Sequence, residues 1–348
     1  MGKKKHYSNQ WEKRWHPLWE QWIVYAAHRN NRPWQGEKIA SEIRETPEYD
    51  PDCYLCPGNT RISGKRNPEF IQPFVFDNDH PVMGAEAPAV SEHRYNELYL
   101  RSSAGGKARV LCYDPRHNVT LSEVSPEQVK AVFRTLQEQM LEFRQDDSIH
   151  SVLIFENKGQ IVGVSNPHPH CQIYASDFSF KLVEQEMVAV NRYSRQKGRN
   201  LFEDILKAEL EEEIRIIAQN DSAIAFIPFF ARYAYEVWIF PKTRHASLCS
   251  MTIKELDEFA LVFQEVIQRY DLNFQQSFPY VMSILQAPVN GRQYTDYHLH
   301  ILIQPPLRQP GLQKFLAGPE IGGGNFMADT IPEEKAAELR KVEISRKL

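Results

Sequence analysis

The sequence lacks any long apolar run, because no stretch approaches the roughly 18 uninterrupted apolar residues that a membrane helix needs. An apolar segment of the kind found in signal peptides is also missing after the N-terminal MGKKKHYSNQWEKR. We therefore expect a soluble, cytoplasmic protein that does not bind a membrane.

The chain also has few cysteines and a small net charge. Five cysteines, an odd number in a chain without secretory features, favour free thiols or metal ligands over paired disulfides. A net charge of -4 gives no electrostatic support for binding nucleic acid or an anionic membrane. An anionic substrate would have to be held by a few well-placed arginines, amides and backbone N–H groups.

Apolar residues are plentiful: 42% of the 348 residues are hydrophobic, enough to bury a substantial core. β-branched and aromatic residues cluster in short segments that are typical of strands. The strands that we expect are Gln21–Ala27, Phe74–Asn78, Arg109–Tyr113, Val152–Asn157, Cys171–Ala175, Ala223–Phe230, Tyr235–Phe240, Tyr280–Leu285 and His298–Ile303. Helices are expected at Pro126–Arg144, at Thr252–Tyr270, where Thr252 and Glu255 fit a capping box, and within Lys181–Ile217 and Glu333–Arg346.

The two halves of the chain repeat one order of elements: a strand that ends near a histidine, a helix, a second strand, and a histidine pair. His117 precedes His168 by 51 residues, and His245 precedes His298 by 53. This near-equality predicts an internal duplication in one α+β unit, with halves at residues 1–180 and 181–348. Only the first half carries Ser-Asn-Pro before its histidine pair, so we expect one half to catalyse and the other to act as a scaffold.

The segment Gly163–Ile173 carries the most chemical information. A strand starting here would place His168, His170 and Gln172 on one face, because side chains alternate with a period of two. A neutral imidazole is a good nucleophile toward phosphorus, and polar groups around His170 suit phosphate oxygens. For an arbitrary His-x-His pair a structural or metal-binding role is the better interpretation, but the surrounding pattern favours catalysis here.

The sequence Ser-Asn-Pro-His-Pro-His-Cys-Gln at 165–172, preceded by Phe-Glu-Asn-Lys-Gly at 155–159, resembles the active-site signature of the galactose-1-phosphate uridylyltransferases. That family is a branch of the histidine-triad superfamily. Further matching blocks lie at 28–34, 53–59, 76–79, 277–280 and 314–320. The resemblance implies a duplicated histidine-triad-like fold with a mainly antiparallel sheet and helices packed on it.

The same resemblance implies roles for residues around the phosphates. His170 matches the nucleophile that attacks the α-phosphorus of UDP-glucose, and Gln172 stands where histidine-triad hydrolases have a third histidine. Ser165, Asn157 and Gly163 match further phosphate contacts. Arg29 and Arg32 match a basic pair near the phosphates, although two solvated surface arginines are the alternative from sequence alone.

Other matching positions imply binding of the nucleoside and the hexose. Asn78 and Asp79 match residues that hold the ribose and base, and an apolar slot would surround them, although its residues could equally be core. The slot residues are Leu55, Ile62, Phe76, Val110 and Phe155. The family's sugar contacts across a dimer interface match Lys314, Phe315, Ala317 and Glu320, whereas composition alone would suggest a plain surface loop there. We therefore expect a homodimer.

The resemblance implies one metal site with a complete set of ligands and a second site with an incomplete set. Cys53-x-x-Cys56 alone is ambiguous between a redox pair and half a metal site, but the family joins such a pair to histidines matching His117 and His168. Two thiolates and two imidazoles suit one structural Zn²⁺ per chain. A second, iron-type site of some members would use Glu186 and three histidines, and two of those positions hold Leu285 and Leu302 here. We expect that second site to be absent.

The function that these calls favour is ping-pong uridylyl transfer between UDP-glucose and galactose 1-phosphate through a nucleotidyl-His170 intermediate, giving UDP-galactose and glucose 1-phosphate. The partners are then a nucleoside-diphosphate hexose and a hexose 1-phosphate, with no nucleic acid. One alternative is a related nucleotidyltransferase or phosphorylase with another base, sugar or phosphate acceptor. Another is a nucleotide-sugar-binding protein without turnover, which the joint presence of His170, Gln172, Ser165 and Asn157 disfavours.

Overall fold

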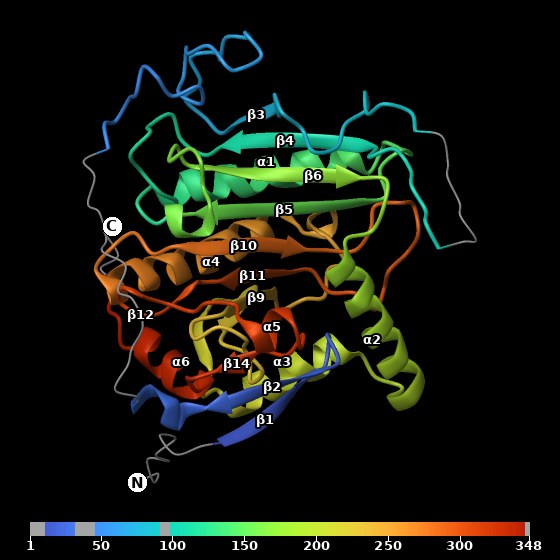
Figure 1. Ribbon diagram of the computed structural model, residues 1–348, viewed down its shortest axis with the longest axis vertical. Coiled ribbons are helices and arrows are strands. Elements are labelled where there is room, and N and C mark those ends of the chain that lie inside the picture. Colours follow the sequence, from blue (N-terminus) through green and yellow to red (C-terminus); the bar gives the residue numbers. More distant parts are fainter. Residues whose placement is uncertain (1–10, 32–45, 91–97, 345–348) are drawn as a thin grey trace.

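The computed structural model describes residues 11–31, 46–90 and 98–344. Within them, nine strands form one sheet in the order β3-β4-β6-β5-β10-β11-β9-β8-β7, and every neighbouring pair is antiparallel (Figure 1). Pairing of β5 with β10 joins the first half of the chain to the second in this sheet. The predicted α+β class with a mainly antiparallel sheet is confirmed.

The strands of this sheet are β3 (Phe74–Asp77), β4 (Gly106–Cys112), β5 (Ser151–Lys158), β6 (His170–Ser176), β7 (Ile216–Gln219), β8 (Ala223–Phe226), β9 (Val237–Pro241), β10 (Tyr280–Leu285) and β11 (His300–Gln304). Smaller sheets contain β1 (Trp11–His16), β2 (Gln21–Ala26), β12 (Leu307–Gln309), β13 (Leu312–Gln313) and β14 (Met327–Ala328). The helices are α1 (Pro126–Phe143), α2 (Lys181–Lys197), α3 (Leu201–Glu212), α4 (Ile253–Phe274), α5 (Gly318–Ile321) and α6 (Pro332–Arg340), with 3-10 turns η1 (Ala27–Asn31), η2 (Gln160–Val162) and η3 (Leu248–Ser250).

The long helices begin where the sequence predicts. Ser125 caps α1 by accepting from the Gln128 N–H, with Pro126 in the first turn. Thr252 and Glu255 form the expected capping box at the start of α4. The single helix expected in 181–217 is instead two, because Gly198 takes a left-handed φ of 66° that ends α2, and Asn200 then caps α3.

The two faces of the sheet differ. Helices α1 and α4 lie together on one face, and the largest apolar cluster fills the space between them and the strands (Figure 1). A second cluster covers the opposite face of the second half, where α2, α3 and the β1–β2 hairpin pack on β8 to β11. His170 and Gln172 alternate with Cys171 and Ile173, which belong to the helix-side core, so both lie on the face away from α1 and α4.

Several elements near the N-terminus and the C-terminus were not predicted. β1 pairs with β2, and β2 pairs in parallel with β14, some 300 residues later in the chain. β7, β12 and β13 were also missed, and the strand expected at 223–230 ends at Phe226. No described helix is both long enough and apolar enough to span a bilayer.

Candidate active site and metal centre

His170 is the first residue of β6, and its ring is held by the backbone two residues earlier. His170 Nδ1 lies 2.8 Å from the His168 carbonyl oxygen. A carbonyl only accepts hydrogen bonds, so Nδ1 carries the proton and Nε2 keeps a free lone pair. Burial lowers the pKa of His170 below its usual value, which keeps the ring neutral at neutral pH.

A cavity of about 50 Å³ brings together most of the residues expected around the phosphates. Its lining contains six predicted site residues: Phe155, Asn157, Gly163, Ser165, His170 and Gln172. Phe155 lies opposite Gln172 in the β5–β6 ladder, which places side chains of the two strands next to one another on this face. A left-handed glycine, Gly163 with φ of 82°, ends η2 just before Ser165.

Tyr174 orients Gln172, although it was not among the predicted site residues. The Tyr174 hydroxyl donates to Gln172 Oε1 at 3.1 Å, so the amide oxygen is occupied and the NH₂ group is left as a donor. The Tyr174 ring also packs edge-on against Phe155, with centroids 4.8 Å apart. An alternating strand pattern marks Tyr174 as sharing the face of Gln172, which is the one signal that could have found it.

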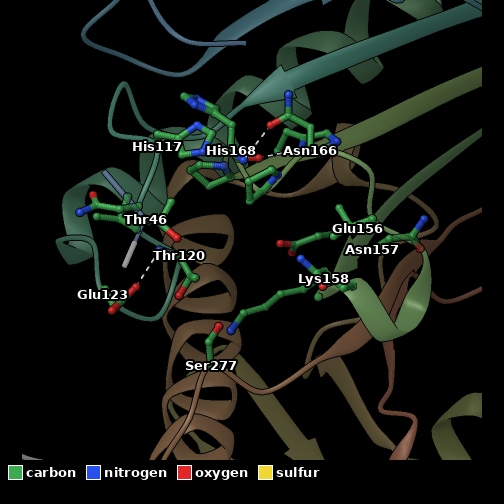
Figure 2. Close-up of a pocket in the computed structure, with 18 residues that line it drawn as sticks. Thr46, His117, Thr120, Glu123, Glu156, Asn157, Lys158, Asn166, His168 and Ser277 are labelled. Carbon is green, nitrogen blue, oxygen red and sulfur yellow. Dashed lines mark hydrogen bonds between the residues drawn. The ribbon is translucent and has the colours of Figure 1, made fainter. Parts of the chain in front are cut away.

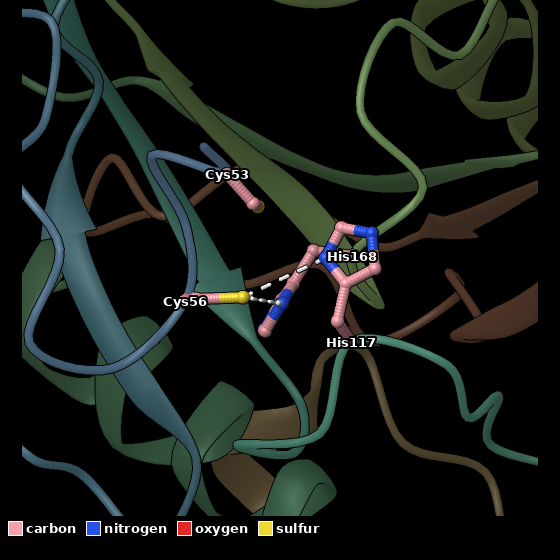
Figure 3. Close-up of side chains that lie close together, drawn as sticks. All are labelled: Cys53, Cys56, His117 and His168. Atoms are coloured by element: carbon pink, nitrogen blue, oxygen red, sulfur yellow. Dashed lines mark hydrogen bonds between the residues drawn. The ribbon is translucent and has the colours of Figure 1, made fainter. Parts of the chain in front are cut away.

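Four predicted metal ligands converge beside the start of β6 (Figure 3). The ligand atoms of Cys53, Cys56, His117 and His168 all lie within 4.8 Å of one another, and all four residues are buried. Cys56 Sγ is 3.6 Å from His117 Nδ1 and 3.5 Å from His168 Nδ1. This buried Cys₂His₂ group has the number and type of donors for one tetrahedral metal ion.

The hydrogen bonds around these ligands fit a metal. His168 Nε2 lies 3.1 Å from the Asp114 carbonyl oxygen, so Nε2 carries the proton and the lone pair of Nδ1 faces Cys56. Burial lowers the pKa of His168 to about 4 and raises that of the Cys56 thiol to about 12. A bound dication would supply the positive charge that a thiolate needs in such a place.

Asn166 connects two of the predicted metal ligands, Cys53 and His168, in the segment that leads to His170. Its side-chain oxygen accepts from the His168 N–H at 2.9 Å, and its amide nitrogen lies 3.4 Å from Cys53 Sγ. The segment that ends at His170 is therefore fixed to the cysteine loop.

The residues predicted to bind the nucleoside differ from one another in burial and in their contacts. Leu55 and Val110 are buried in a small apolar cluster together with Cys53 and Cys56, and Phe76 packs against that cluster, whereas Ile62 is 57% exposed. Asp79 Oδ2 accepts from the Ser63 N–H at 3.2 Å, and Asn78 Oδ1 accepts from the His80 N–H at 2.9 Å. Asn78 thus stabilises its own loop, and Asp79 joins that loop to the one that contains Ser63.

The residues expected to touch the far phosphate and the hexose lie on another part of the chain. Arg29 follows β2 and lies 3.5 Å from Asp329, just after β14. Lys314 forms an ion pair of 3.0 Å with Glu320, and Phe315 is 60% exposed. None of the predicted residues Arg29, Lys314, Phe315, Ala317 and Glu320 lines the cavity that contains His170, Gln172 and Ser165. Arg32 lies outside the described residues.

A larger pocket of about 380 Å³ opens beside the same loop (Figure 2). Glu156 and Lys158 point into it, whereas Asn157 between them points away. Lys158 Nζ lies 3.2 Å from Asp271, and the Tyr280 hydroxyl donates to Glu156 Oε2 at 3.1 Å. Burial raises the pKa of Glu156 to about 7, against the opposing effect of Lys158.

Comparison with known proteins gives a consistent result. Residues 3–179 match the family model described as galactose-1-phosphate uridyl transferase, N-terminal domain, and residues 186–347 match the C-terminal domain of the same family. The chain is 36% identical over 329 residues to a galactose-1-phosphate uridylyltransferase of Haemophilus influenzae, covering 94% of this chain and 93% of that protein. A relative of the same name in Saccharomyces cerevisiae is 32% identical, with 97% and 96% covered.

Solved structures agree with this assignment. A structure titled "Structure of uridylyltransferase" is 29% identical with a TM-score of 0.76, covering 89% of this chain and 96% of that one. The fold is shared with an ADP-glucose phosphorylase from Arabidopsis thaliana at 19% identity and a TM-score of 0.75. The family models, the relatives and the arrangement around His170 agree, and the chain belongs to the galactose-1-phosphate uridylyltransferase family.

Proposed function

We propose that this protein transfers a uridylyl group from UDP-glucose to galactose 1-phosphate in two steps through a covalent adduct on His170. The observation that carries the proposal is the free Nε2 lone pair of a neutral, backbone-fixed imidazole in a cavity shared with Gln172, Ser165 and Asn157. Membership in a family whose curated relatives carry that activity in their names supports the choice of substrates.

In the first step, His170 Nε2 forms a bond to the α-phosphorus of UDP-glucose, and the bond from that phosphorus to the bridging oxygen breaks. Glucose 1-phosphate leaves with the bond electrons. The ring becomes positive as the new bond forms, and the hydrogen bond from Nδ1 to the His168 carbonyl strengthens with it. The Gln172 NH₂ group, oriented by Tyr174, is placed to donate to a phosphoryl oxygen.

In the second step, a phosphate oxygen of galactose 1-phosphate attacks the same phosphorus, and the phosphorus–nitrogen bond breaks. UDP-galactose leaves and His170 returns to its neutral form, so no net proton is consumed. Incubation with labelled UDP-glucose alone should release glucose 1-phosphate and leave one label on His170. A label on another residue, or turnover that needs both substrates bound at once, would contradict the covalent mechanism.

Inorganic phosphate is the acceptor that distinguishes a phosphorylase, the alternative function, from the proposed transferase. A phosphorylase would release a nucleoside diphosphate from the adduct on adding phosphate, whereas the proposed enzyme would turn over only with a hexose 1-phosphate. A protein that binds the nucleotide sugar without turnover would release no glucose 1-phosphate under either condition.

We propose zinc as the metal held by Cys53, Cys56, His117 and His168. Two thiolates with two imidazoles at tetrahedral spacing suit Zn²⁺. The ion would supply structural charge compensation, and it would fix the His168 ring and with it the carbonyl that orients His170. All five cysteines are free, as a reducing cytoplasmic compartment would keep them.

We propose that two copies of the chain form a dimer in which each active site takes Lys314, Phe315, Ala317 and Glu320 from the partner. The support is that these residues, together with Arg29, gather around β2 and β14, near the end of the sheet that is far from β6 (Figure 1). Phe315 and Ile321 leave 60% and 76% of their surface exposed there.

Complementation tests the borrowed segment. His170→Ala and Glu320→Ala should each be inactive, yet a refolded mixture of the two should recover about a quarter of the wild-type activity, because half of the dimers are hybrids with one intact site. A mixture that stays inactive while differently tagged chains co-purify as hybrid dimers would contradict the proposal.

A further inference from the structure

Glu186 is a fully buried carboxylate on α2, and it lies in the second half of the chain beneath the β1–β2 hairpin. Both of its oxygens are already hydrogen-bonded. The Trp19 indole Nε1 donates to Oε1 at 3.1 Å, and the Tyr297 hydroxyl donates to Oε2 at 2.5 Å. A buried carboxylate needs partners of this kind, because an unpaired one costs several kcal/mol.

The surroundings do not fit the iron-type site that some family members have at this position. On the strands nearby, Leu285 lies directly opposite His300 in the β10–β11 ladder, and Leu302 follows two residues along the same face. Neither leucine has a lone pair for a cation. Among the described residues, only Cys53, Cys56, His117 and His168 bring three or more metal-binding side chains within 4.8 Å.

Two other groups at this place also disfavour a metal. His16 Nδ1 accepts from the Trp19 backbone N–H at 3.1 Å, so the other ring nitrogen of neutral His16 carries a proton and cannot coordinate. The guanidinium of Arg232 lies 3.8 Å from the Trp19 ring centroid, and its charge interacts with Glu236 and, more weakly, with Glu186. A fixed cation in this region disfavours a second cation by repulsion.

The same contacts hold the turn of the hairpin. Gln185, next to Glu186, donates to the Trp19 carbonyl at 2.7 Å, and Arg192 of the same helix donates to Glu20. Trp19 itself is 2% exposed. The turn between β1 and β2 is therefore attached to α2 through both the backbone and the side chain of one tryptophan.

The hairpin in turn carries the segment proposed to bind the hexose. β2 pairs with β14 through Val24 and Met327, and Asn325 donates to the Trp22 carbonyl at 3.2 Å. Met327 is linked to Glu320 by a backbone N–H bond of 3.2 Å and to Lys314 through its carbonyl. A continuous set of contacts runs from Glu186 through Trp19 and β2 to Lys314 and Glu320.

We propose that Glu186, held by Trp19 and Tyr297 in place of a metal, is a positioning residue that anchors the β1–β2 hairpin and through it the Lys314–Glu320 segment. The part that concerns the hexose rests on the proposed uridylyl transfer; the metal-free anchor does not. Glu186 touches no reacting atom, so its effect must reach the site through the position of the hairpin.

Trp19→Phe tests the anchor, because it keeps an aromatic ring in the core and removes the N–H that Glu186 accepts, together with part of the indole ring. Trp22→Phe is the exposed control: it makes the same change in the same hairpin at a side chain that is 42% exposed. We expect Trp19→Phe to lower Tm by at least about 2–4 °C through the lost hydrogen bond and the space left by the smaller ring, and Trp22→Phe to leave Tm nearly unchanged. Equal Tm values for the two variants would overturn the anchor.

Metal analysis and kinetics complete the test. Wild-type protein loaded with excess Zn²⁺ or Fe²⁺ should retain about one metal ion per chain, and Glu186→Gln should retain the same number. Two ions per chain, one of them lost in Glu186→Gln, would overturn the metal-free assignment. In Trp19→Phe the KM for galactose 1-phosphate should rise about 3- to 10-fold while the rate of adduct formation at saturating UDP-glucose stays the same. An unchanged KM would remove the link to the hexose; wild-type protein without any transfer would refute the proposed function, and the Tm and metal results would still decide the anchor.

Discussion

His170 and His300 occupy the same place in the two halves of the molecule, and only one of them is set up as a nucleophile. Each begins its strand, and each Nδ1 lies close to the carbonyl oxygen two residues earlier, at 2.8 Å in His170 and 3.0 Å in His300. The backbone therefore fixes the same tautomer in both rings. What differs is the surroundings of the other ring nitrogen, Nε2, which in His300 lies 3.5 Å from Glu186 Oε1 in the buried interior.

The strand registers show the difference. Gln172 follows His170 by two residues, and continuing the β5–β6 ladder by two residues from the Phe155–Gln172 pair brings Asn157 opposite His170. In the second half the same two places hold Leu302 and Leu285. His300 is also fully buried beneath α2, α3 and the hairpin, whereas His170 lines an open cavity. Backbone geometry alone therefore does not make a catalytic histidine; polar neighbours and access to substrate do.

The largest expected effect separates the two histidines directly. His170→Ala should reduce uridylyl transfer by about 10⁴-fold or more, because no other group can form the covalent bond. His300→Ala should still form the labelled adduct in its folded fraction and should instead lower Tm, since it removes a buried ring. Rapid quench with labelled UDP-glucose measures both. Adduct formation in His170→Ala, or its loss in folded His300→Ala, would reverse the assignment.

Exchanging the neighbours tests why the halves differ. Gln172→Leu gives the active half the residue found at 302, and it should lower kcat by about 10²–10³-fold through the loss of one preorganised phosphate donor. The KM for UDP-glucose should change much less. Gln172→Glu is a useful companion, because it keeps the size but adds a negative charge beside the phosphates. A kcat within threefold of wild type in Gln172→Leu would show that the amide does not act in the transition state.

The two histidine ligands of the first half correspond to His245 and His298 in the second, but among the described residues no cysteine pair joins these two, which gives a test on stability. Cys56→Ser should reduce bound metal from about one ion per chain to nearly none and cost a few kcal/mol of stability. The other three ligands, Cys53, His117 and His168, would then be left buried without a metal ion. Elemental analysis and thermal unfolding in the presence and absence of a chelator measure this. Chelator-insensitive Tm in the wild type would contradict a structural metal here.

The sequence predicted the active half better than the scaffolding half, and the reason is physical. His170, Gln172, Ser165 and Asn157 lie within 16 residues of one another in a strand-loop-strand unit, so local periodicity places them. The contact of Trp19 with Glu186 joins residues 167 positions apart, and no local pattern encodes it. Glu186 is buried under the hairpin because of tertiary packing, which local sequence patterns do not describe.

Long-range strand pairing likewise sets the position of the proposed phosphate and hexose residues, and local sequence patterns do not encode it. Arg29 was expected beside the phosphates, yet its neighbour in the chain's own fold is Asp329, because β2 pairs with β14. The motif identified the residues, but their position relative to His170 depends on a pairing between the two ends of the chain. In the proposed dimer, a second copy of the chain brings the two sets together.

The smallest expected effect concerns the helix-side face, where the halves differ again: Glu156 in the first half corresponds to Ile284 in the second, by the same alignment of ladders. Glu156 is buried against Tyr280 and Lys158, and burial raises its pKa to about 7. When the pKa of a carboxyl group is higher in the folded than in the unfolded protein, the protonated group contributes its full stability to the fold below the unfolded pKa, here near 4.5. That contribution to the free energy of unfolding is lost as the pH rises from 4.5 toward 7.

Glu156→Gln should therefore remove a pH dependence rather than a fixed amount of stability. A neutral amide of the same shape still accepts from Tyr280, so near pH 4.5 the variant and the wild type should unfold with similar free energies. Between pH 4.5 and 7 the wild type should lose about 2–3 kcal/mol relative to the variant, because only the wild type must keep a proton that its unfolded chain has released. Other buried carboxyls, such as Glu209, titrate in both proteins and cancel in the difference. Urea unfolding at several pH values measures that difference, and a constant gap across the range would show that Glu156 is ionised in the folded protein, held so by Lys158.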